Sequence, residues 1–373
     1  MAVSDVEQRT TASVDAERAA WIGFNLVSGV GPVRTERLLD VFGTLAEAWA
    51  APPERLRTML DERTLGRLTR VSREGQVHRT IERLDETGIR VVIRTDPDYP
   101  ERLTEIPAPP PILYLRGDLL AADRHAVAIV GTRRMTAYGR DVTARIAAGL
   151  AEAGVTVVSG LALGIDGVAH RAALDAGGRT VGVKGCGVNV PYPAAHVRMA
   201  DEMAGSGAVV SEYAPDRKPE AANFPARNRI ISGLSLGTVV IEAPERSGAL
   251  ITVSFALDHG REVFVVPGDV RSEMSAGCNA LLRDGARPVR SADDILADLN
   301  LAGRHAPVAI QPALPLGDAE RTVLDALRAG PMHIDEIAVT LGQPVFQVAT
   351  QLMMLELDGR VRNTGGQVYA GGW

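Results

Sequence analysis

Long apolar runs are missing from this chain of 373 residues, although 46% of its residues are hydrophobic. No stretch approaches the roughly 20 apolar residues that a membrane-spanning helix needs. The first residues mix acids and arginines without the apolar core of a signal peptide, so we interpret residues 1–17 as a disordered lead-in. We therefore expect a cytoplasmic protein that does not contact membranes.

Cysteine is scarce. Cys186 and Cys278 are the only two, and neither lies in a Cys-x-x-Cys or Cys/His pattern. Because disulfide frameworks and zinc sites need such spacing, we predict reduced thiols and no metal.

A general excess of positive charge is also lacking, since the formal net charge is −6. This excludes a protein coated with basic patches, so any contact with nucleic acid must come from a few locally placed arginines. Only Lys184 and Lys218 are lysines among the 40 basic residues. The placement of the arginines is therefore more informative than their number.

Helical patterning predicts an N-terminal domain over residues 18–94. Its segment 28–43 has Gly-x-Gly-Pro before an amphipathic stretch, which is typical of a SAM-like or helix-hairpin-helix module. The glycine amides of such a hairpin can hold a nucleic-acid phosphate. A module that only packs is the alternative, and the short motif does not decide between them.

The pattern changes after the helices. A proline-crowded connector over 95–120 favours extended chain, and short β-branched runs then alternate with helical stretches as far as residue 300. This alternation predicts an α/β domain over 95–300 with a Rossmann-like parallel sheet. An Ala/Pro-rich linker over 301–318 precedes helices and two short strands over 319–373, the order of a winged helix.

Open α/β sheets bind ligands beyond the carboxyl ends of their strands, so the turns after the apolar runs are candidate sites. Small residues there let backbone amides face a ligand closely. A dinucleotide fingerprint and an NTPase P-loop are both absent from these turns, which argues against a nucleotide cofactor. We predict instead a nest of amides beside arginines that holds a phosphodiester without cutting it, with a tightly turned structural loop as the alternative.

The segment 223–235 places an aromatic ring before several polar groups. Phe224 precedes Arg227, Asn228 and Arg229. Stacking of a base on such a ring contributes about 1–3 kcal/mol whatever the base, while arginines contact the backbone. We predict that Phe224 stacks on a base; a buried anchor at the start of the helix is the alternative.

Several blocks of this sequence, in the same order and spacing, resemble the DNA-processing protein A (DprA/Smf) family over residues 95–300. The blocks are VAIVGTRRMTAYGR, VVSGLALGIDGVAHRAALDAGG, GCGVNVPYP, SEYAP, NFPARNRIISGLSLGTVVIEA, SGALITVSFALDHGREVFVVPG and GCNALLRDGA. The N-terminal helices and the winged helix also resemble accessory domains of longer family members.

The resemblance implies a protein of natural transformation that binds single-stranded DNA, protects it and loads the RecA recombinase on it as a homodimer. It implies no enzymatic turnover and no cofactor. Lys184 departs from the family, whose members commonly have an uncharged residue there, so it is either an added phosphate contact or an exposed lysine. The residues that we expect to bind DNA are Gly131, Thr132, Arg133, Arg134, Ser159, Gly160, Gly164, Lys184, Phe224, Arg227, Asn228 and Arg229.

Two other functions stay open. A nucleotide-hydrolysing enzyme of the phosphoribohydrolase type would use Glu242 as a general acid or base. The following loop, however, lacks the double glycine that would cradle a nucleoside monophosphate. A scaffold that binds proteins through its winged helix is the other possibility.

The winged helix is ambiguous, because residues 319–373 hold four arginines and six acidic residues. Its presumed recognition helix offers Gln347, Thr350 and Gln351 but no arginine. Contact with double-stranded DNA would therefore depend on Arg360 and Arg362 in the wing.

Dimerisation is predicted for the segment 250–266. It offers an amphipathic helix beside a strand that we expect at the outer edge of the sheet, and a twofold partner readily covers such features. Packing within the domain is the alternative.

Overall fold

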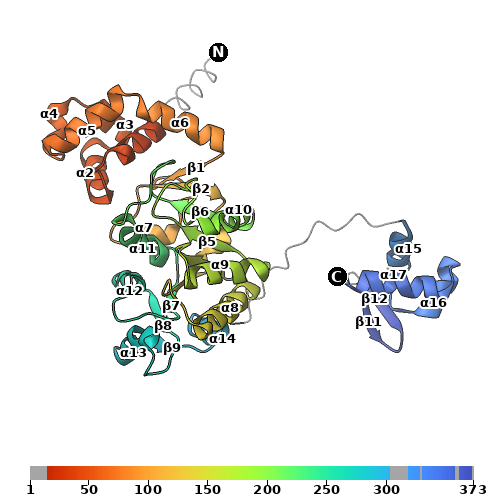
Figure 1. The fold of residues 1–373 in the computed structure, drawn as a ribbon. Helices are drawn as coiled ribbons and strands as arrows, with labels where there is room; N and C mark the ends of the chain where they lie inside the picture. The colour runs from red at the N-terminus through yellow and green to blue at the C-terminus, as the bar shows by residue number, and fades with distance from the viewer. Residues whose placement is uncertain (1–14, 303–317, 328–329, 358–360, 372–373) are drawn as a thin grey trace, which may run out of the picture. The chain divides into compact units, whose positions relative to one another are not determined.

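The computed structural model describes residues 15–302, 318–327, 330–357 and 361–371 (Figure 1). The chain forms two compact units, Met1–Pro307 and Val308–Trp373. Most of the expected lead-in and linker lie outside the described residues, but residues 15–26 are helical. Within the described ranges, no helix has both the length and the apolar character needed to cross a bilayer.

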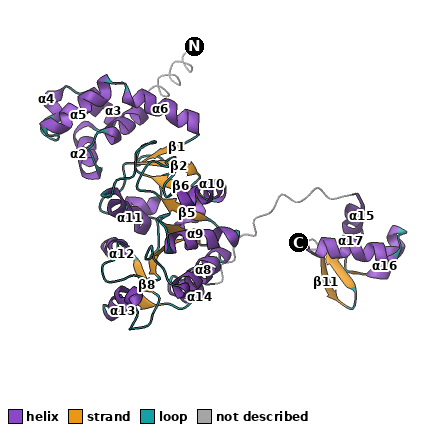
Figure 2. Cartoon of the chain, in the orientation of Figure 1, coloured by secondary structure: helices purple, strands orange, loops and turns teal. Residues whose placement is uncertain are grey.

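A nine-stranded sheet forms the centre of the larger unit (Figures 1 and 2). Its order is β1-β2-β6-β5-β4-β3-β7-β8-β9, parallel from β6 to β9 and antiparallel at β1 and β2. The strands are β1 Arg90–Ile93, β2 Ile112–Gly117, β3 Ala126–Val130, β4 Thr156–Ser159, β5 Thr180–Val183, β6 Ala208–Ser211, β7 Gly237–Val240, β8 Glu262–Val265 and β9 Arg287–Pro288. The Rossmann-like parallel sheet predicted from the sequence is thereby confirmed.

Helices cover both faces of this sheet, which explains why its central strands are apolar throughout. In β3, Val127 and Ile129 pack with one helical layer, and Ala128 and Val130 with the other. The first layer contains α8 Ala137–Glu152, α9 Ile165–Asp175 and α14 Ala292–Asp298; the second contains α11 Asn223–Gly233, α12 Ala249–Asp258 and α13 Ala276–Arg283. The helix α10 Val197–Ser206 and the short α7 Glu101–Thr104 complete the domain, with 3-10 turns at Ala121–Arg124, Ala194–His196 and Glu273–Ser275.

The chain between the helices and β3 is more regular than we expected. The connector 95–120 contains both α7 and β2, and β1 joins the sheet although it precedes residue 95. At the other side, β8 is not the outer strand, because β9 pairs with it. The expectation of an open edge beside α12 is therefore wrong.

The N-terminal helices pack around Trp21, Phe24 and Leu38. After the helix at 15–26 they are α2 Pro32–Phe42, α3 Leu45–Ala50, α4 Pro53–Leu56, α5 Glu62–Arg73 and α6 Gln76–Thr87. Asn25 joins them to the α/β part, since its amide donates to the Glu212 carbonyl at 3.0 Å and its oxygen accepts from the Tyr114 hydroxyl at 3.0 Å.

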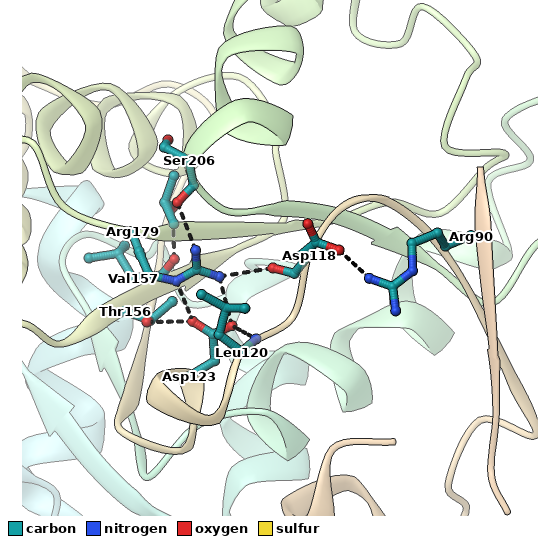
Figure 3. A network of polar contacts seen from close by, with 9 residues as sticks. Arg90, Asp118, Leu120, Asp123, Thr156, Val157, Arg179 and Ser206 are labelled. Atoms are coloured by element: carbon teal, nitrogen blue, oxygen red, sulfur yellow. Dashed lines mark hydrogen bonds and ion pairs between the residues drawn. The ribbon is translucent and has the colours of Figure 1, made fainter. Parts of the chain in front are cut away.

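Arg179 connects several segments at the amino end of the parallel strands (Figure 3). Its guanidinium donates to both carboxylate oxygens of Asp123, at 3.0 and 2.9 Å, and to the carbonyls of Asp118 and Ser206, each at 2.9 Å. Asp123 also accepts from the Thr156 hydroxyl at 2.7 Å. Because this network lies at the end of the strands opposite to their carboxyl ends, we assign it to stability.

The smaller unit has the element order of a winged helix, as predicted. Its elements are α15 Asp318–Ala326, β10 Met332–His333, α16 Ile334–Leu341, α17 Val345–Leu357, β11 Val361–Gly365 and β12 Val368–Gly371. The strands pair in the order β10-β12-β11, and β10 is an element that the sequence did not suggest.

Candidate nucleic-acid interface

An open cleft lies where the strand order reverses between β3 and β7. The chain proceeds from β3 to β4 on one side and returns to β7 on the other, so the loops after β3 and β7 diverge. Such a switch point is where open α/β sheets bind ligands. The cleft has a volume of about 690 Å³, and its walls come from the turns after β3 and β7, the start of α9, and the helices α11 and α12.

The turn after β3 presents two arginines to this cleft. Gly131 is required by close approach, because a Cβ atom there would lie 2.9 Å from the Glu242 carbonyl oxygen. The buried Thr132 fixes the turn: its amide donates to the same carbonyl at 2.7 Å, and its hydroxyl accepts from the Arg134 amide at 3.2 Å. Arg133 and Arg134 are exposed and have no carboxylate partner among the residues the structure describes.

The polar groups of the turn after β4 are bonded within the protein. The Ser159 hydroxyl donates to the Ile129 carbonyl at 2.6 Å, and the amides of Gly160 and Ala162 donate to the Asp166 carboxylate at 3.1 and 3.3 Å. The predicted nest of free amides is therefore wrong at these positions. Gly164 adopts a φ of 83°, which favours glycine, and brings the chain back beside Thr132.

Arg227 lines the cleft but is largely buried. Its side chain is 4% exposed, and it donates to the Gly160 carbonyl at 2.6 Å and to the Val183 carbonyl. Burial lowers the pKa of Arg227 to about 10, while the charge of Asp166 opposes this shift. Arg227 therefore ties the ends of β4 and β5 together, and its predicted contact with DNA stays a prediction.

Arg229 and Lys184 are likewise held by the protein itself. Arg229, 9% exposed, forms an ion pair with Glu212. Lys184, 5% exposed, donates to the carbonyls of Val188, at 3.3 Å, and Val190. Burial lowers the pKa of Lys184. The expectation of an exposed lysine is therefore wrong, because the ammonium group closes the loop after β5. A phosphate contact of Lys184 stays a prediction, since the residue lines a small pocket with Arg133 and Phe224.

Phe224 lies at the mouth of the cleft, partly exposed. Its ring centre is 5.5 Å from that of Tyr192, with the planes tilted by 41°, and the Arg133 guanidinium carbon is 6.0 Å from the Phe224 ring centre. Asn228, also partly exposed, lines the cleft and donates to the Gly248 carbonyl at 3.3 Å. The cleft thus combines cations with aromatic faces, as a strand of nucleic acid requires.

Arg246 and Tyr192 also line this cleft and can contact a ligand, but the sequence did not suggest them. Arg246 is exposed and follows β7 as Arg133 follows β3. Because β3 and β7 are neighbouring strands, an arginine in the loop after each of them was a signal that could have identified Arg246. Tyr192 is 39% exposed and lies in an irregular loop, so only its contact with Phe224 identifies it.

Glu242, the candidate acid of the enzyme alternative, is not among the residues that line the cleft. It is 2% exposed, and its carboxylate accepts from the Thr136 amide at 2.9 Å and from the Thr136 hydroxyl at 2.6 Å. It lines a separate depression with Tyr138 and Pro267. Among the described residues, no group of three or more acidic, histidine or cysteine side chains could hold a metal ion.

The winged helix presents a different surface. The exposed residues of α17 include Gln347 and Thr350, but also Phe346, which is 70% exposed, and Met353. Arg360 and the side chain of Arg362 both lie outside the part of the chain that the structure describes. On its described residues α17 offers no cation for a DNA backbone.

The fold and the cleft define a Rossmann-like α/β protein with an arginine-lined cleft at its topological switch point and a C-terminal winged helix. Two family models match the chain: DNA recombination-mediator protein A over residues 90–300 and the DprA winged helix domain over residues 306–367. The chain belongs to the DprA/Smf family.

Individual relatives agree with this membership. Protein Smf of Synechocystis is 32% identical over 95% of this chain and 99% of its own length, and protein Smf of Escherichia coli is 40% identical over 72% and 74%. The crystal structure of DprA from Streptococcus pneumoniae superposes with a TM-score of 0.67 at 33% identity, covering 75% of this chain and 97% of that one. A Helicobacter pylori DprA structure, titled for its single-stranded DNA-binding mode, gives 0.52 at 30% identity, over 57% of this chain and 95% of that one.

Proposed function

We propose that this protein binds single-stranded DNA in the cleft between β3 and β7 and holds it without cutting it. The observation that carries this proposal is that the exposed Arg133, Arg134 and Arg246 line one cleft with the partly exposed ring of Phe224. Arginines form charge-assisted bonds to phosphates, and an aromatic face stacks on any base. The DprA structure from H. pylori, which is described by its single-stranded DNA-binding mode, supports the same ligand.

The biological role that we propose is protection of incoming strands in natural transformation and loading of RecA on them. Family membership supports this role, because relatives at 40–47% identity are named DNA processing proteins or Smf. The protein would work as a homodimer, so that two clefts act on one strand with raised effective concentration. The exposed Leu257 of α12 makes this helix face a suitable contact for the partner.

We further propose that no enzymatic turnover occurs in the cleft. A general acid or base must reach the reacting atoms, whereas Glu242 is buried and engaged with Thr136 outside the cleft. A phosphoribohydrolase activity is therefore the less favoured function.

The test is a fluorescence-anisotropy titration of oligothymidylate with the double variant Arg133→Ala/Arg246→Ala. We expect the affinity to fall by about tenfold or more for each arginine, since a hydrogen bond to a charged group is worth about 1.5–3 kcal/mol. The matched control is Arg145→Ala/Arg171→Ala, which removes two arginines that pair with carboxylates outside the cleft. Equal affinities of a folded cleft variant and the control would reject the proposed site.

A further inference from the structure

Helix α5 (Glu62–Arg73) belongs to the N-terminal helices (Figure 1) and carries a row of arginines. Arg63, Arg67, Arg70 and Arg73 follow one another at intervals of three or four residues, so they share one side of the helix. The other side packs through Thr64, Leu65 and Val71. We name these four arginines the arginine stripe.

The arginine stripe has no carboxylate partner within the described part of the chain. Helix α5 has one acidic residue, Glu62, and this pairs with Arg57 at 3.0 Å. Arg67 donates to the carbonyl of Ser28 at 2.7 Å, while Arg63, Arg70 and Arg73 are exposed. Three cations along one helix side are thus free to bind an external anion.

Gly66 lies on the same side, between the arginines. A Cβ atom added there would meet nothing within 4 Å, so packing does not require a glycine. Glycine inside a helix is less stable than alanine by about 1 kcal/mol. The absent side chain leaves the helix backbone open to the close approach of a ligand.

The stripe also lies beside the Gly-x-Gly turn. Arg67 reaches the Ser28 carbonyl, and Arg34 of α2 donates to the Thr64 hydroxyl of α5 at 3.0 Å. The turn that the sequence suggested for phosphate contact and the arginine stripe therefore belong to one surface.

We propose that the arginine stripe is a second DNA-binding surface that contacts the sugar–phosphate backbone without reading bases. Arginine suits this role because its planar fork of donors matches a phosphate, and the stripe spans about 15 Å of helix. An acidic protein is the less suitable partner, because the hot spots of protein interfaces combine arginines with aromatic anchors, and the exposed residues of α5 include no aromatic or other large apolar side chain. This inference rests on the proposed function, since its ligand is a longer stretch of the same strand.

The test variant is Arg63→Ala/Arg70→Ala/Arg73→Ala, which leaves Arg67 in its contact with Ser28. Binding to oligothymidylates of increasing length is measured by anisotropy at several salt concentrations. We expect unchanged affinity for the shortest strand that fills the cleft and weaker binding of long strands. For the long strands, the slope of the logarithm of affinity against the logarithm of salt concentration should become shallower by about 0.7 for each lost phosphate contact. The corresponding lysine variant should keep most of the binding, because each lysine retains the charge.

The matched control is Arg145→Ala/Arg171→Ala/Arg287→Ala, which lowers the net charge equally at arginines paired with carboxylates. The inference would be overturned if the stripe variant kept its melting temperature and bound long strands as well as the control does. An acidic protein would then be the partner to test. In that case Arg133→Ala should still weaken binding, and the proposed function would stand. Failure of the unmodified protein to bind any strand would overturn both.

Discussion

Replacing Arg227 with methionine should destabilise the fold strongly while leaving the exposed arginines of the cleft in place. Arg227→Met removes the donors to the carbonyls of Gly160 and Val183 and leaves the buried Asp166 without its neighbouring cation. Removing one partner of a buried charged pair typically costs about 3–5 kcal/mol. Methionine roughly fills the space of the arginine stem, so little of this cost would come from a cavity.

The assay is urea unfolding at pH 7, with Arg133→Ala as the matched control because Arg133 is exposed. Arg227→Met should lower the unfolding midpoint, and Arg133→Ala should not. The double variant Asp166→Asn/Arg227→Met should lose less stability than the two single changes together, by a coupling energy of about 0.5–3 kcal/mol. Normal stability combined with lost DNA affinity in Arg227→Met would refute this assignment and restore Arg227 as a phosphate donor.

Four further outcomes follow from contacts described above. Phe224→Ala should weaken binding of single strands by about 1–3 kcal/mol for any sequence, with little change in melting temperature; strong destabilisation with normal binding would favour a core anchor. Arg179→Met should lower the melting temperature but leave affinity unchanged, and a loss of affinity at equal stability would contradict its assignment. Leu257→Asp should shift a dimer towards monomer in sedimentation at micromolar concentration, and monomer in the unmodified protein would reject the dimer. Burial lowers the pKa of His170 to about 3 in the folded protein. Between pH 7 and pH 5 the imidazole of His170 therefore becomes protonated only in the unfolded chain. The free energy of unfolding should then fall by about 2 kcal/mol, and His170→Asn should flatten that dependence.

The strands β3 to β8 were predictable because each is a short apolar run whose two faces are covered by helices. The remaining strands carry weaker signals. The strand β9 has only two residues, one of them Pro288, and β1 has four; both are strands because of the neighbours they pair with. Pairing between distant segments is a tertiary effect that local patterns do not contain.

The position of the cleft was predictable as well, because the carboxyl ends of parallel strands meet at one edge. Which cations are exposed in the cleft was not predictable. Arg133 and Arg227 both lie beside small or polar residues in the sequence, as phosphate donors often do, yet only Arg133 is exposed. The difference arises from Asp166 and the carbonyls of Gly160 and Val183, which hold Arg227 inside. Lys184 is hidden by the same kind of backbone contact.

The central claim is that the cleft holds single-stranded DNA without cutting it. A competition titration tests it most directly: the unmodified protein is bound to a labelled oligothymidylate, and unlabelled single-stranded or double-stranded oligonucleotides are added at several salt concentrations. We predict that the single strand competes far better than the duplex, that affinity falls steeply with salt because phosphates are neutralised, and that the recovered DNA is intact. Equal competition by duplex, or shortened or base-depleted DNA after incubation, would contradict the account.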